Sequence, residues 1–386
     1  MTRLRKLIDT DKCEYNWKKI WKIPEFAKLR ECQQSPRWHK EGNVDKHVEM
    51  VCNEAIKVAR DEYEGEDRLV FLAAALFHDI GKGVTTKIGK DGNWHSYGHE
   101  FEGEKITRFL LWNEDVWLRE RICVLVRYHM EIEFIPESEK FLPKLVSMSK
   151  AVKNLDMLIA LKECDLRGSI QADEELKAVE FQKLDDVRET ARSLGFLYHT
   201  TDIPDFYKFP WQKTLKAKNS GKPITVVVPI GLSGAGKSTW IAENYPDAVV
   251  ISRDTIREEL GYVKPGQKAV LSREKEDKVS TVFNQRLTDA ARDGSKPIVL
   301  DNLNLKKKYR DAYKEQLSLY AVNWVYAYIE AKGLQTNLER RKDDLDMDVL
   351  TGMVMSFDWP RPDEYDKFGI FTNGKTPLDS DDIDDG

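Results

Sequence analysis

A glycine-rich segment in the second half of the chain has the spacing of a loop that binds polyphosphate. It runs Gly231-Leu-Ser-Gly-Ala-Gly-Lys-Ser238 and fits the pattern G-x-x-x-x-G-K-[ST]. In such a loop the backbone N–H groups surround the phosphates, the lysine adds a positive charge, and the serine hydroxyl binds Mg²⁺. The residues expected to contact ATP and Mg²⁺ are Gly231, Ser233, Gly234, Ala235, Gly236, Lys237, Ser238 and Thr239.

The residues on either side of this loop predict the strand–loop–helix order that its chemistry needs. The β-branched run Ile224–Ile230 is typical of a buried parallel strand. The residues from Ser238 onward are a plausible helix start. A glycine-rich turn that binds nothing is the alternative, and this context argues against it.

A second group of reactive side chains, Arg253-Asp254-Thr-Ile-Arg257, follows the next expected strand at 248–252. Residues just beyond the carboxyl end of a strand lie at the ligand-binding edge of a parallel sheet. There Asp254 can accept a proton from an attacking hydroxyl, and Arg257, one helical turn later, can hold a phosphate with two hydrogen bonds. A surface ion pair at a helix start is the alternative. The basic run 306–310 either binds acceptor phosphates or is a solvated helix face.

The first half of the chain carries residues that suit a divalent metal. His78 and Asp79 end an apolar segment that predicts a buried helix over 69–77. The further candidate ligands are His47, His99, His129 and Asp165. Each histidine could instead be a polar core residue, but the whole ordered set favours a metal site. Lys82 can hold a substrate phosphate. His39, His95 and His199 match no metal position; we expect them at the surface, with substrate contact as the alternative for His39 and His95.

The order His…His-Asp…His…His…Asp resembles the HD phosphohydrolase superfamily. In that superfamily the first histidine, the His-Asp pair and the last aspartate hold a metal between helices. The resemblance therefore assigns the first metal to His47, His78, Asp79 and Asp165.

The segment Gly98-His99-Glu100 with Gly103, and the ending Asp165-Leu-Arg-Gly168, resemble HD domains attached to bacterial tRNA nucleotidyltransferases. Those domains act on 2′,3′-cyclic phosphates and 2′-phosphates. The resemblance implies that His99 and His129 bind a second metal, and two metals can activate a water and neutralise a phosphate. Imidazole ligands suit Mn, Ni, Co or Fe, so the ligands leave the metal undecided.

The second half resembles phage-type 5′-hydroxyl polynucleotide kinases. These share the phosphate loop, Arg-Asp-x-x-Arg, a strand ending like Asp301-Asn-Leu-Asn304, and a late arginine-rich helix, in this order. The resemblance implies that Asp254 is the general base and Arg257 grips the acceptor phosphate. Asp301 and Asn304 resemble residues that line the acceptor side. The arginine-rich stretch implies a lid residue that stabilises transition-state charge, which can be either Arg340 or Arg341.

Together the halves resemble bacterial RNA end-healing enzymes of the HD-Pnk type, over roughly residues 35–365. The resemblance implies a kinase for 5′-hydroxyl ends, a hydrolase for 2′,3′-cyclic phosphate and 2′-phosphate ends, and a polynucleotide ligase as a partner. RNA ends are the expected substrate, with DNA ends as a second acceptor class. A small-molecule or nucleotide kinase fused to an HD nucleotidase is the alternative. A non-catalytic regulatory protein would have lost some of these residues.

Composition argues against a general nucleic-acid-binding protein, a disulfide-bonded protein and a membrane protein. The 41% hydrophobic and 33% charged residues of this 386-residue chain fit a globular protein with an ample core. The net charge of −5 restricts nucleic-acid binding to a local basic patch. The five cysteines include no C-x-x-C pair, which favours reduced thiols and a cytoplasmic location. No apolar run approaches a membrane span, and we expect no membrane partner.

The pattern predicts an all-helical HD domain at 1–200, a linker at 201–222, and a P-loop kinase domain with a parallel sheet at 223–370. Residues 1–40 are expected to form a helical lead-in. The interruption at 83–98 is expected to be a loop over the site. Expected helices span 44–59, 69–77, 103–111, 117–127 and 153–162; further strands span 297–301 and 322–329. The acidic tail, 371–386, is expected to be disordered.

Overall fold

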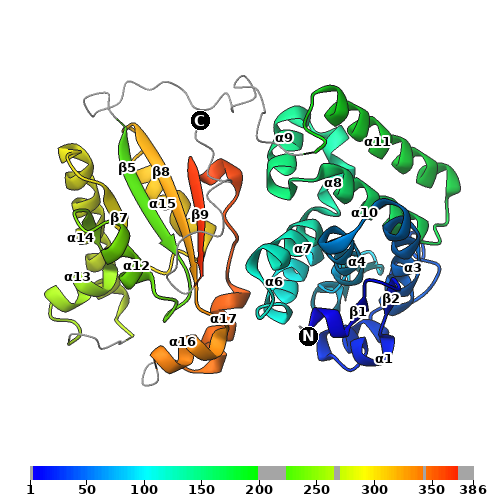
Figure 1. Ribbon diagram of the computed structural model, residues 1–386, viewed down its shortest axis with the longest axis horizontal. Helices are drawn as coiled ribbons and strands as arrows, with labels where there is room; N and C mark the ends of the chain where they lie inside the picture. Colours follow the sequence, from blue (N-terminus) through cyan, green and yellow to red (C-terminus); the bar gives the residue numbers. More distant parts are fainter. Residues whose placement is uncertain (1–2, 199–222, 265–269, 342–344, 373–386) are drawn as a thin grey trace. The chain divides into compact units, whose positions relative to one another are not determined.

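The computed structural model describes residues 3–198, 223–264, 270–341 and 345–372. The chain divides into two units, Met1–Phe209 and Pro210–Gly386 (Figure 1). The boundary between them, the expected linker at 201–222 and most of the expected acidic tail lie outside the described residues. Strand β9, Lys367–Thr372, takes in the first two residues of that expected tail.

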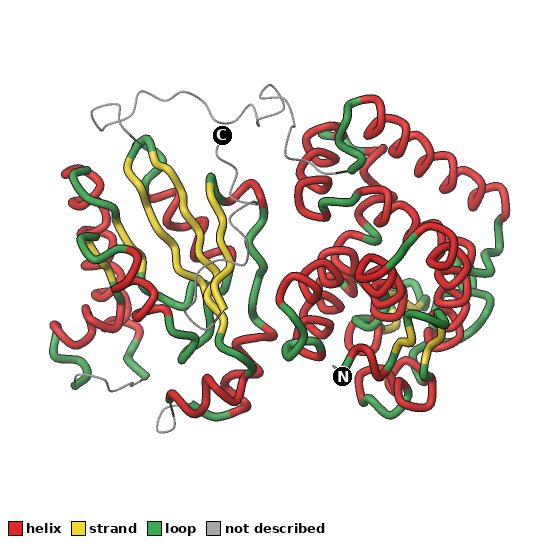
Figure 2. The backbone as a smooth tube through the Cα atoms, in the orientation of Figure 1, coloured by secondary structure: helices red, strands yellow, loops and turns green. Residues whose placement is uncertain are grey.

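The first unit is helical, as the sequence predicts (Figure 2). Its longer helices are α3 (Val44–Glu62), α4 (Gly65–Phe77), α6 (His99–Leu110), α7 (Val116–Tyr128), α9 (Phe141–Val152), α10 (Leu155–Arg167) and α11 (Glu174–Ser193). Its shorter helices are α1 (Trp17–Ile20), α2 (Pro24–Ala27), α5 (Lys82–Thr85) and α8 (Glu131–Phe134), with 3-10 turns at η1 (Leu4–Lys6), η2 (Lys28–Arg30) and η3 (Ile135–Glu137).

Helix α4 is the centre of this unit. Every residue from Leu69 to Phe77 is buried, and α3, α7 and α10 pack around the helix. A helix that is apolar on all sides is stable only inside a core. The burial of α4 therefore places His78 and Asp79, which follow it directly, in the interior of the unit.

Two segments of the first unit differ from the sequence-based expectation. The lead-in before residue 40 is only partly helical, because β1 (Ile8–Asp9) and β2 (Glu14–Tyr15) form an antiparallel pair there. The expected loop at 83–98 contains most of α5 and a small hairpin of β3 (Lys87–Ile88) and β4 (Trp94–His95). Asp91-Gly92, with φ +76° at the glycine, is the turn chemistry that favours such a hairpin.

The second unit is built on a five-stranded parallel sheet with the order β6-β7-β5-β8-β9. These strands are β5 (Ile224–Ile230), β6 (Val249–Ile251), β7 (Ile298–Leu300), β8 (Val322–Glu330) and β9. The helices are α12 (Lys237–Asn244), α13 (Arg253–Glu259), α14 (Arg273–Asp293), α15 (Lys307–Gln316), α16 (Leu334–Arg340) and α17 (Met347–Met355), with a 3-10 turn at η5 (Pro362–Glu364). The expected strands are all present, and β9 is an additional edge strand.

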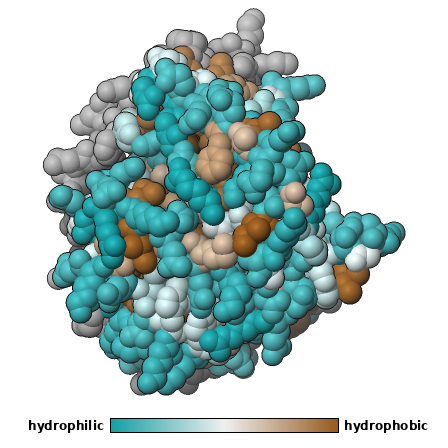
Figure 3. All heavy atoms as spheres, turned by 90° about the vertical axis from the view of Figure 1, so that its right-hand side faces the viewer, coloured by the Kyte–Doolittle hydropathy of each residue, from teal (hydrophilic) through white to brown (hydrophobic). Residues whose placement is uncertain are grey.

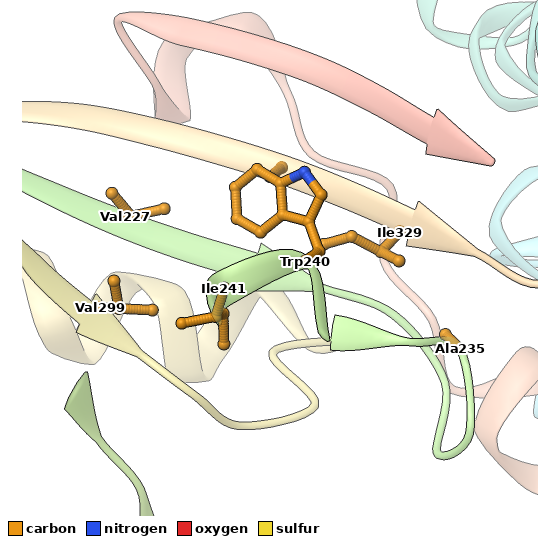
Figure 4. Close-up of a cluster of buried hydrophobic side chains, with 7 residues drawn as sticks. Val227, Ala235, Trp240, Ile241, Val299 and Ile329 are labelled. Atoms are coloured by element: carbon orange, nitrogen blue, oxygen red, sulfur yellow. The ribbon is translucent and has the colours of Figure 1, made fainter. Parts of the chain in front are cut away.

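The core of the second unit fixes the helix that follows the glycine-rich loop. Trp240 and Ile241 of α12 pack against Val227 of β5, Val299 of β7 and Ile329 of β8 (Figure 4). These contacts hold α12 on the sheet, so the first residue of the helix, Lys237, has a defined position at the carboxyl edge of β5.

The five cysteines are buried and unpaired, in agreement with the expectation of reduced thiols. One face of the molecule, shown in Figure 3, is largely hydrophilic, with apolar side chains in separate patches. Within the described ranges no helix combines the length and apolar character needed to cross a membrane.

Gly81, in the turn after α4, tests how closely α6 approaches that turn. A Cβ at Gly81 would lie 2.0 Å from the carbonyl oxygen of His99 and 2.6 Å from the amide nitrogen of Gly103. Because both neighbours are backbone atoms, Gly81→Ala must displace the start of α6. We expect it to lower the free energy of unfolding by about 1–3 kcal/mol, measured by thermal or urea denaturation.

Gly352→Ala is the control, because no atom lies within 4 Å of its added Cβ in α17. It should be neutral or stabilising by up to about 1 kcal/mol. Unfolding of Gly81→Ala at the wild-type midpoint would mean that the start of α6 can move away from the turn without loss of stability.

Candidate metal centre and candidate phosphotransfer site

The candidate ligands of the first unit converge from separate helices onto one buried centre. His47 comes from α3, His78 and Asp79 follow α4, His99 begins α6, His129 ends α7, and Asp165 comes from α10. All of these side chains are buried. The structure therefore brings together every residue that the sequence proposed as a metal ligand.

The centre contains two groups of ligand atoms. In the first group, Nε2 of His47 lies 3.3 Å from Nε2 of His78 and 2.9 Å from Oδ1 of Asp165. Oδ2 of Asp79 lies 3.5 Å from Nε2 of His47 and 3.4 Å from Nε2 of His78. The facing atoms of His47, His78 and Asp79 all lie within 4.8 Å of one another, so one ion can contact these three side chains. Asp165 lies beside the two histidines of this group.

In the second group, Nε2 of His99 lies 3.3 Å from Nε2 of His129. The other carboxylate oxygen of Asp79, Oδ1, lies 3.2 Å from His99 Nε2 and 3.9 Å from His129 Nε2. Each oxygen of Asp79 thus faces a different pair of histidines. A carboxylate in this position can bridge two ions.

The outer nitrogens of the rings explain why the Nε2 atoms face the centre. Nδ1 of His78, His99 and His129 lies 2.8, 2.9 and 2.7 Å from the carbonyl oxygen three residues earlier, that of Ala75, Ser96 and Val126. A carbonyl can only accept, so each Nδ1 carries a hydrogen, and in the neutral form of each ring the Nε2 lone pair is directed at the centre.

His47 has a different outer partner. Its Nδ1 lies 3.0 Å from Oε1 of Glu41, although the angles are not those of a good hydrogen bond. The same Glu41 oxygen lies 2.8 Å from Nδ1 of His39, whose ring packs edge-on against His47. His39 is therefore half-buried beside the centre, which corrects our expectation that it lies at the surface.

Two further histidines outside the ligand set, His95 and His199, are also expected at the surface. His95 is partly exposed and contacts both carboxylate oxygens of Asp91 at 2.9 Å, away from the ligand set. His199 lies outside the described residues.

The carboxylates of the centre are ionised in spite of their burial. Burial alone would raise the pKa of Asp79, but Lys82 and His78 hold this pKa well below its ordinary value. Burial would likewise raise the pKa of Asp165, but Lys162 and His47 hold it low. Burial and the neighbouring His99 and His78 depress the pKa of His129, which keeps that imidazole neutral. Ionised carboxylates and neutral imidazoles are the forms that bind metals.

The pKa of His47 moves the other way, to about 9. Burial lowers it, but the contacts with Asp165, Glu41 and Asp79 outweigh burial. A cation in the middle of the first group would replace the proton that these carboxylates otherwise favour.

The fit to a metal can also be judged from Asp79 itself. Its Oδ2 is buried and accepts no well-formed hydrogen bond among the described residues, although Nζ of Lys82 lies 2.7 Å away. Lys82 also donates to Oε1 of Gln34 at 3.0 Å. The residues present thus suit one or two transition ions, with Lys82 at the side of the centre.

In the second unit, the glycines of the phosphate loop occupy positions that other residues could not. Gly234 and Gly236 have φ +77° and +103°, and a Cβ at Gly231 would lie 2.3 Å from the carbonyl oxygen of Ile329. Lys237 follows as the first residue of α12 and donates to the carbonyl oxygens of Gly231 and Leu232 at 2.9 and 3.0 Å. Ser238 and Thr239 are exposed in the first turn of the helix.

The two arginines of the lid segment lie in different surroundings. Nη1 of Arg340 lies 3.2 Å from the carbonyl oxygen of Gly234 and 3.3 Å from that of Ala235. Arg341 borders the cavity over the loop and lowers the pKa of Asp301 electrostatically. Arg340 thus contacts the loop backbone, while Arg341 lines the cavity and acts electrostatically on the half-buried Asp301.

The Arg-Asp-x-x-Arg residues occupy α13, and the two arginines share the carboxylate of Glu276 in α14. Arg257 contacts Oδ1 of Asp254 at 2.5 Å and both oxygens of Glu276 at 3.1 Å. Arg253 contacts the same Glu276 at 3.0 Å. The side chain of Asp254 is 72% exposed, so its second oxygen can reach a bound molecule. The motif therefore forms a fixed cluster of two cations and two anions.

The strand end Asp301–Asn304 lies between the loop and α13. Burial raises the pKa of Asp301, with Lys237 and Arg341 opposing this and Asp254 adding to it. Asn302 accepts a hydrogen bond from the backbone N–H of Arg253 at 3.3 Å. This strand end therefore contacts both the donor side and the acceptor side.

The basic run 306–310 is less available than its sequence suggests. Arg310 is fully buried and pairs with Glu364, while Lys307 pairs with Asp311. Lys306 and Tyr309 line the cavity over the phosphate loop. The buried Arg310 thus fits neither interpretation of the run, and Lys306 is the lysine of the run that borders the cavity.

One cavity of about 1480 Å³ contains the phosphate loop and α13 together. Lys237, Asp254, Arg257, Asp301 and Arg341 all line it. It continues between α14 and α15, past Phe283 and Tyr313.

Sequence reasoning missed the partners that hold these residues. Glu41 contacts His47 and Glu276 contacts Arg257, but neither glutamate belongs to a sequence motif that would predict its contact. Lys162 contacts Oδ2 of Asp165 at 2.9 Å and stands one helical turn before it, which is the one spacing signal that could have found it.

Comparisons with known proteins agree with this division. Residues 44–165 match the HD domain family, and residues 226–360 match a family described as an AAA domain. Two curated relatives, both named "Multifunctional CCA protein" and both from Actinobacillus pleuropneumoniae (serotypes 5b and 7), are 32% identical over 155 residues. The match covers 38% of this chain and 36% of each relative, so it spans about a third of their length.

Two solved structures are also similar. A sugar kinase from a Janibacter species is 18% identical with a TM-score of 0.27, over 40% of this chain and 88% of that one. A gluconokinase from Sinorhizobium meliloti is 21% identical with a TM-score of 0.28, over 38% of this chain and 82% of that one. The family matches and the geometry together identify the chain as an HD domain, residues 44–165, joined to a P-loop kinase-like domain, residues 226–360.

Proposed function

We propose that this chain heals RNA ends with two activities. Its P-loop domain phosphorylates 5′-hydroxyl polynucleotide ends with ATP and Mg²⁺, and its HD domain hydrolyses 2′,3′-cyclic phosphate and 2′-phosphate ends. The observation that carries the kinase part is the cavity that places Lys237 and the Asp254–Arg257 pair in one space. Its volume of about 1480 Å³ exceeds the roughly 300–1,000 Å³ of ordinary small-ligand pockets, so donor and acceptor can be bound together.

In the kinase reaction the loop backbone and Lys237 bind the donor phosphates, and Ser238 contributes to Mg²⁺ binding. Asp254 accepts the proton of the attacking 5′-hydroxyl, since it lines the cavity beside Arg257 and its side chain is largely exposed. Arg257 holds the acceptor phosphate. Arg341, with its place beside Asp301, is the better candidate to stabilise charge on the transferred group, while Arg340 fixes the loop.

In the HD domain, His47, His78, Asp79 and Asp165 would hold a first ion, and Asp79, His99 and His129 a second. Bound ions of this kind lower the pKa of a water and neutralise a phosphate. Lys82 lies at the edge of the centre and would contact the substrate phosphate once Asp79 binds metal. The outer contacts of the histidine rings keep their lone pairs directed inward.

The two activities complement each other chemically. RNA cleavage that leaves a 2′,3′-cyclic phosphate and a 5′-hydroxyl produces ends that a ligase usually cannot join. One domain would restore each end, which makes a cytoplasmic polynucleotide ligase the expected partner. DNA ends carrying a 5′-hydroxyl are a further acceptor class for the kinase domain.

A specific observation favours the alternative, a kinase for a small acceptor. Arg253 and Arg257 both pair with Glu276, and among the described residues Lys306 is the main additional cation along the acceptor side of the cavity. A reader of long polynucleotides would present more basic surface. Comparing kcat/KM for a nucleoside 3′-monophosphate, a 5′-hydroxyl oligonucleotide and a small polyol distinguishes these acceptors.

The metal content of the HD domain is the first expected result. We expect up to two transition ions per chain, because the two oxygens of Asp79 face two ligand groups. His129→Ala should reduce the content by about one ion, and Asp79→Ala should reduce both. Elemental analysis of protein freed from any affinity tag measures this. His95→Ala, outside the ligand set, should keep the wild-type content; one ion in the wild type, unaffected by His99→Ala or His129→Ala, would contradict the two-ion arrangement.

The second expected result is that the two activities are independent of each other. Incubating RNA that carries a 5′-hydroxyl and a 2′,3′-cyclic phosphate with ATP and metal, and resolving both ends, measures the two reactions at once. Lys237→Ala should abolish 5′-phosphorylation and leave cyclic phosphate hydrolysis unchanged, because Lys237 belongs to the second unit. Asp79→Ala should do the reverse. Loss of both reactions in a folded single variant would require a shared active site.

The third expected result concerns the role of Asp254 as the general base. Asp254→Asn should lower kcat for phosphate transfer by about 10²-fold or more, the usual scale for a general base, while the Kd for ATP stays unchanged. Glu259→Gln, on the same helix and paired with Arg286, is the matched control and should retain activity. Normal turnover by Asp254→Asn would exclude it as the base and direct attention to Asp301.

A further inference from the structure

A chain of side-chain hydrogen bonds joins the strand before the phosphate loop to the helix that carries Asp254. Nδ2 of Asn304 donates to the carbonyl oxygens of Pro229, in β5, and Leu300, in β7, both at 2.8 Å. The hydroxyl of Tyr313 donates to Oδ1 of Asn304 at 3.0 Å and accepts from Nδ2 of Asn302 at 3.1 Å.

The last hydrogen bond of this series reaches the backbone of α13. Oδ1 of Asn302 accepts the N–H of Arg253 at 3.3 Å. Arg253 is the first residue of α13, and Asp254 is the second. The position of the candidate base is thus connected through Tyr313 to the end of β5, two residues before Gly231.

The hydroxyl of Tyr313 has a role that only a group of its kind can fill. It must donate to one amide and accept from another, which a hydroxyl does and a hydrocarbon cannot. Burial raises the pKa of this phenol to about 12, so it remains a donor at neutral pH. The ring stacks on Phe283 of α14, with centroids 5.7 Å apart, which fixes its orientation.

Asn304 shows that the network has a structural cost. It is 3% exposed and has φ +54°, the left-handed region that asparagine tolerates better than most residues. Such a backbone persists only where its surroundings determine it, and here the amide is fully engaged on both sides.

We propose that Tyr313 is a positioning residue for phosphoryl transfer. Its hydroxyl sets the separation between the loop that holds the donor and the helix that holds the general base. The inference rests on the proposed kinase activity of this site. Phosphoryl transfer depends almost entirely on such positioning, and a misplacement of about 1 Å can cost as much as 10²-fold in rate.

Tyr313→Phe tests the inference, because it removes the hydroxyl and keeps the stacked ring. We expect kcat to fall by about 10-fold or more, with the KM for ATP and for the acceptor within about twofold of wild type. Tyr326→Phe is the matched control: Tyr326 is a buried tyrosine of β8 whose hydroxyl has no hydrogen-bond partner among the described residues. It should retain wild-type kcat.

Hydrogen exchange supplies a readout that does not depend on activity. Amides at the start of α13 should exchange faster in Tyr313→Phe than in Tyr326→Phe, since the anchor of the Arg253 N–H is weakened. Asn302→Ala should give the same faster exchange and a similar loss of kcat. The double variant Tyr313→Phe/Asn302→Ala should lose little more than either single variant, because both interrupt the same connection.

The outcomes separate this inference from the proposed function. A wild-type chain that phosphorylates no 5′-hydroxyl polynucleotide would refute the proposed substrate, while the exchange contrast still decides whether Tyr313 anchors α13. An active wild type with equal kcat in Tyr313→Phe and Tyr326→Phe would overturn the positioning role. A raised acceptor KM at unchanged kcat would overturn it too, since it would make Tyr313 a binding residue.

Discussion

The buried charge of Asp79 is the constraint on which the first unit depends. An ionised carboxylate in a helical core is stable only when cations or hydrogen-bond donors surround it. Lys82 supplies one of these groups from one turn later and His99 supplies another from a separate helix, while the apolar helix α4 places Asp79 between them. Gly81 permits α6 to approach the turn after α4, which places His99 within reach of Asp79. The packing of this unit is thus organised around a charge that its core would otherwise exclude.

In the second unit, the topology of the parallel sheet brings the site residues together. Its parallel strands end at one edge, so a loop after β5, a helix after β6 and an asparagine-rich turn after β7 become neighbours although they are far apart in sequence. The hydrophobic contacts of Trp240 and Ile241 hold the donor side, and the Glu276 contacts hold the arginines of the acceptor side. Packing and polar contacts therefore act on different parts of one cavity.

The sequence predicted the parts of this protein whose signals are local. Apolar periodicity predicted the helices around α4, alternating strand and helix patterns predicted β5 to β8, and motif spacing predicted the strand–loop–helix order at the glycine-rich loop. The resemblance to HD phosphohydrolases named the six side chains that meet in the buried centre. The sequence could not predict partners that only the tertiary structure brings together. No sequence spacing relates Glu41 to His47, Glu276 to Arg257 or Tyr313 to Asn302. Arg310 shows the opposite error, since a residue in a basic run became the buried partner of Glu364.

The buried cysteines have a practical consequence for labelling the two units site-specifically. Burial raises the pKa of the Cys32, Cys52, Cys123 and Cys164 thiols, that of Cys164 to about 12. Thiol reagents attack thiolates that solvent can reach, so the native cysteines should react slowly in the folded chain. A single cysteine introduced on the surface of each unit could then be labelled selectively in the otherwise native sequence. Fluorescence transfer between two such dyes would report the distance between the units during turnover.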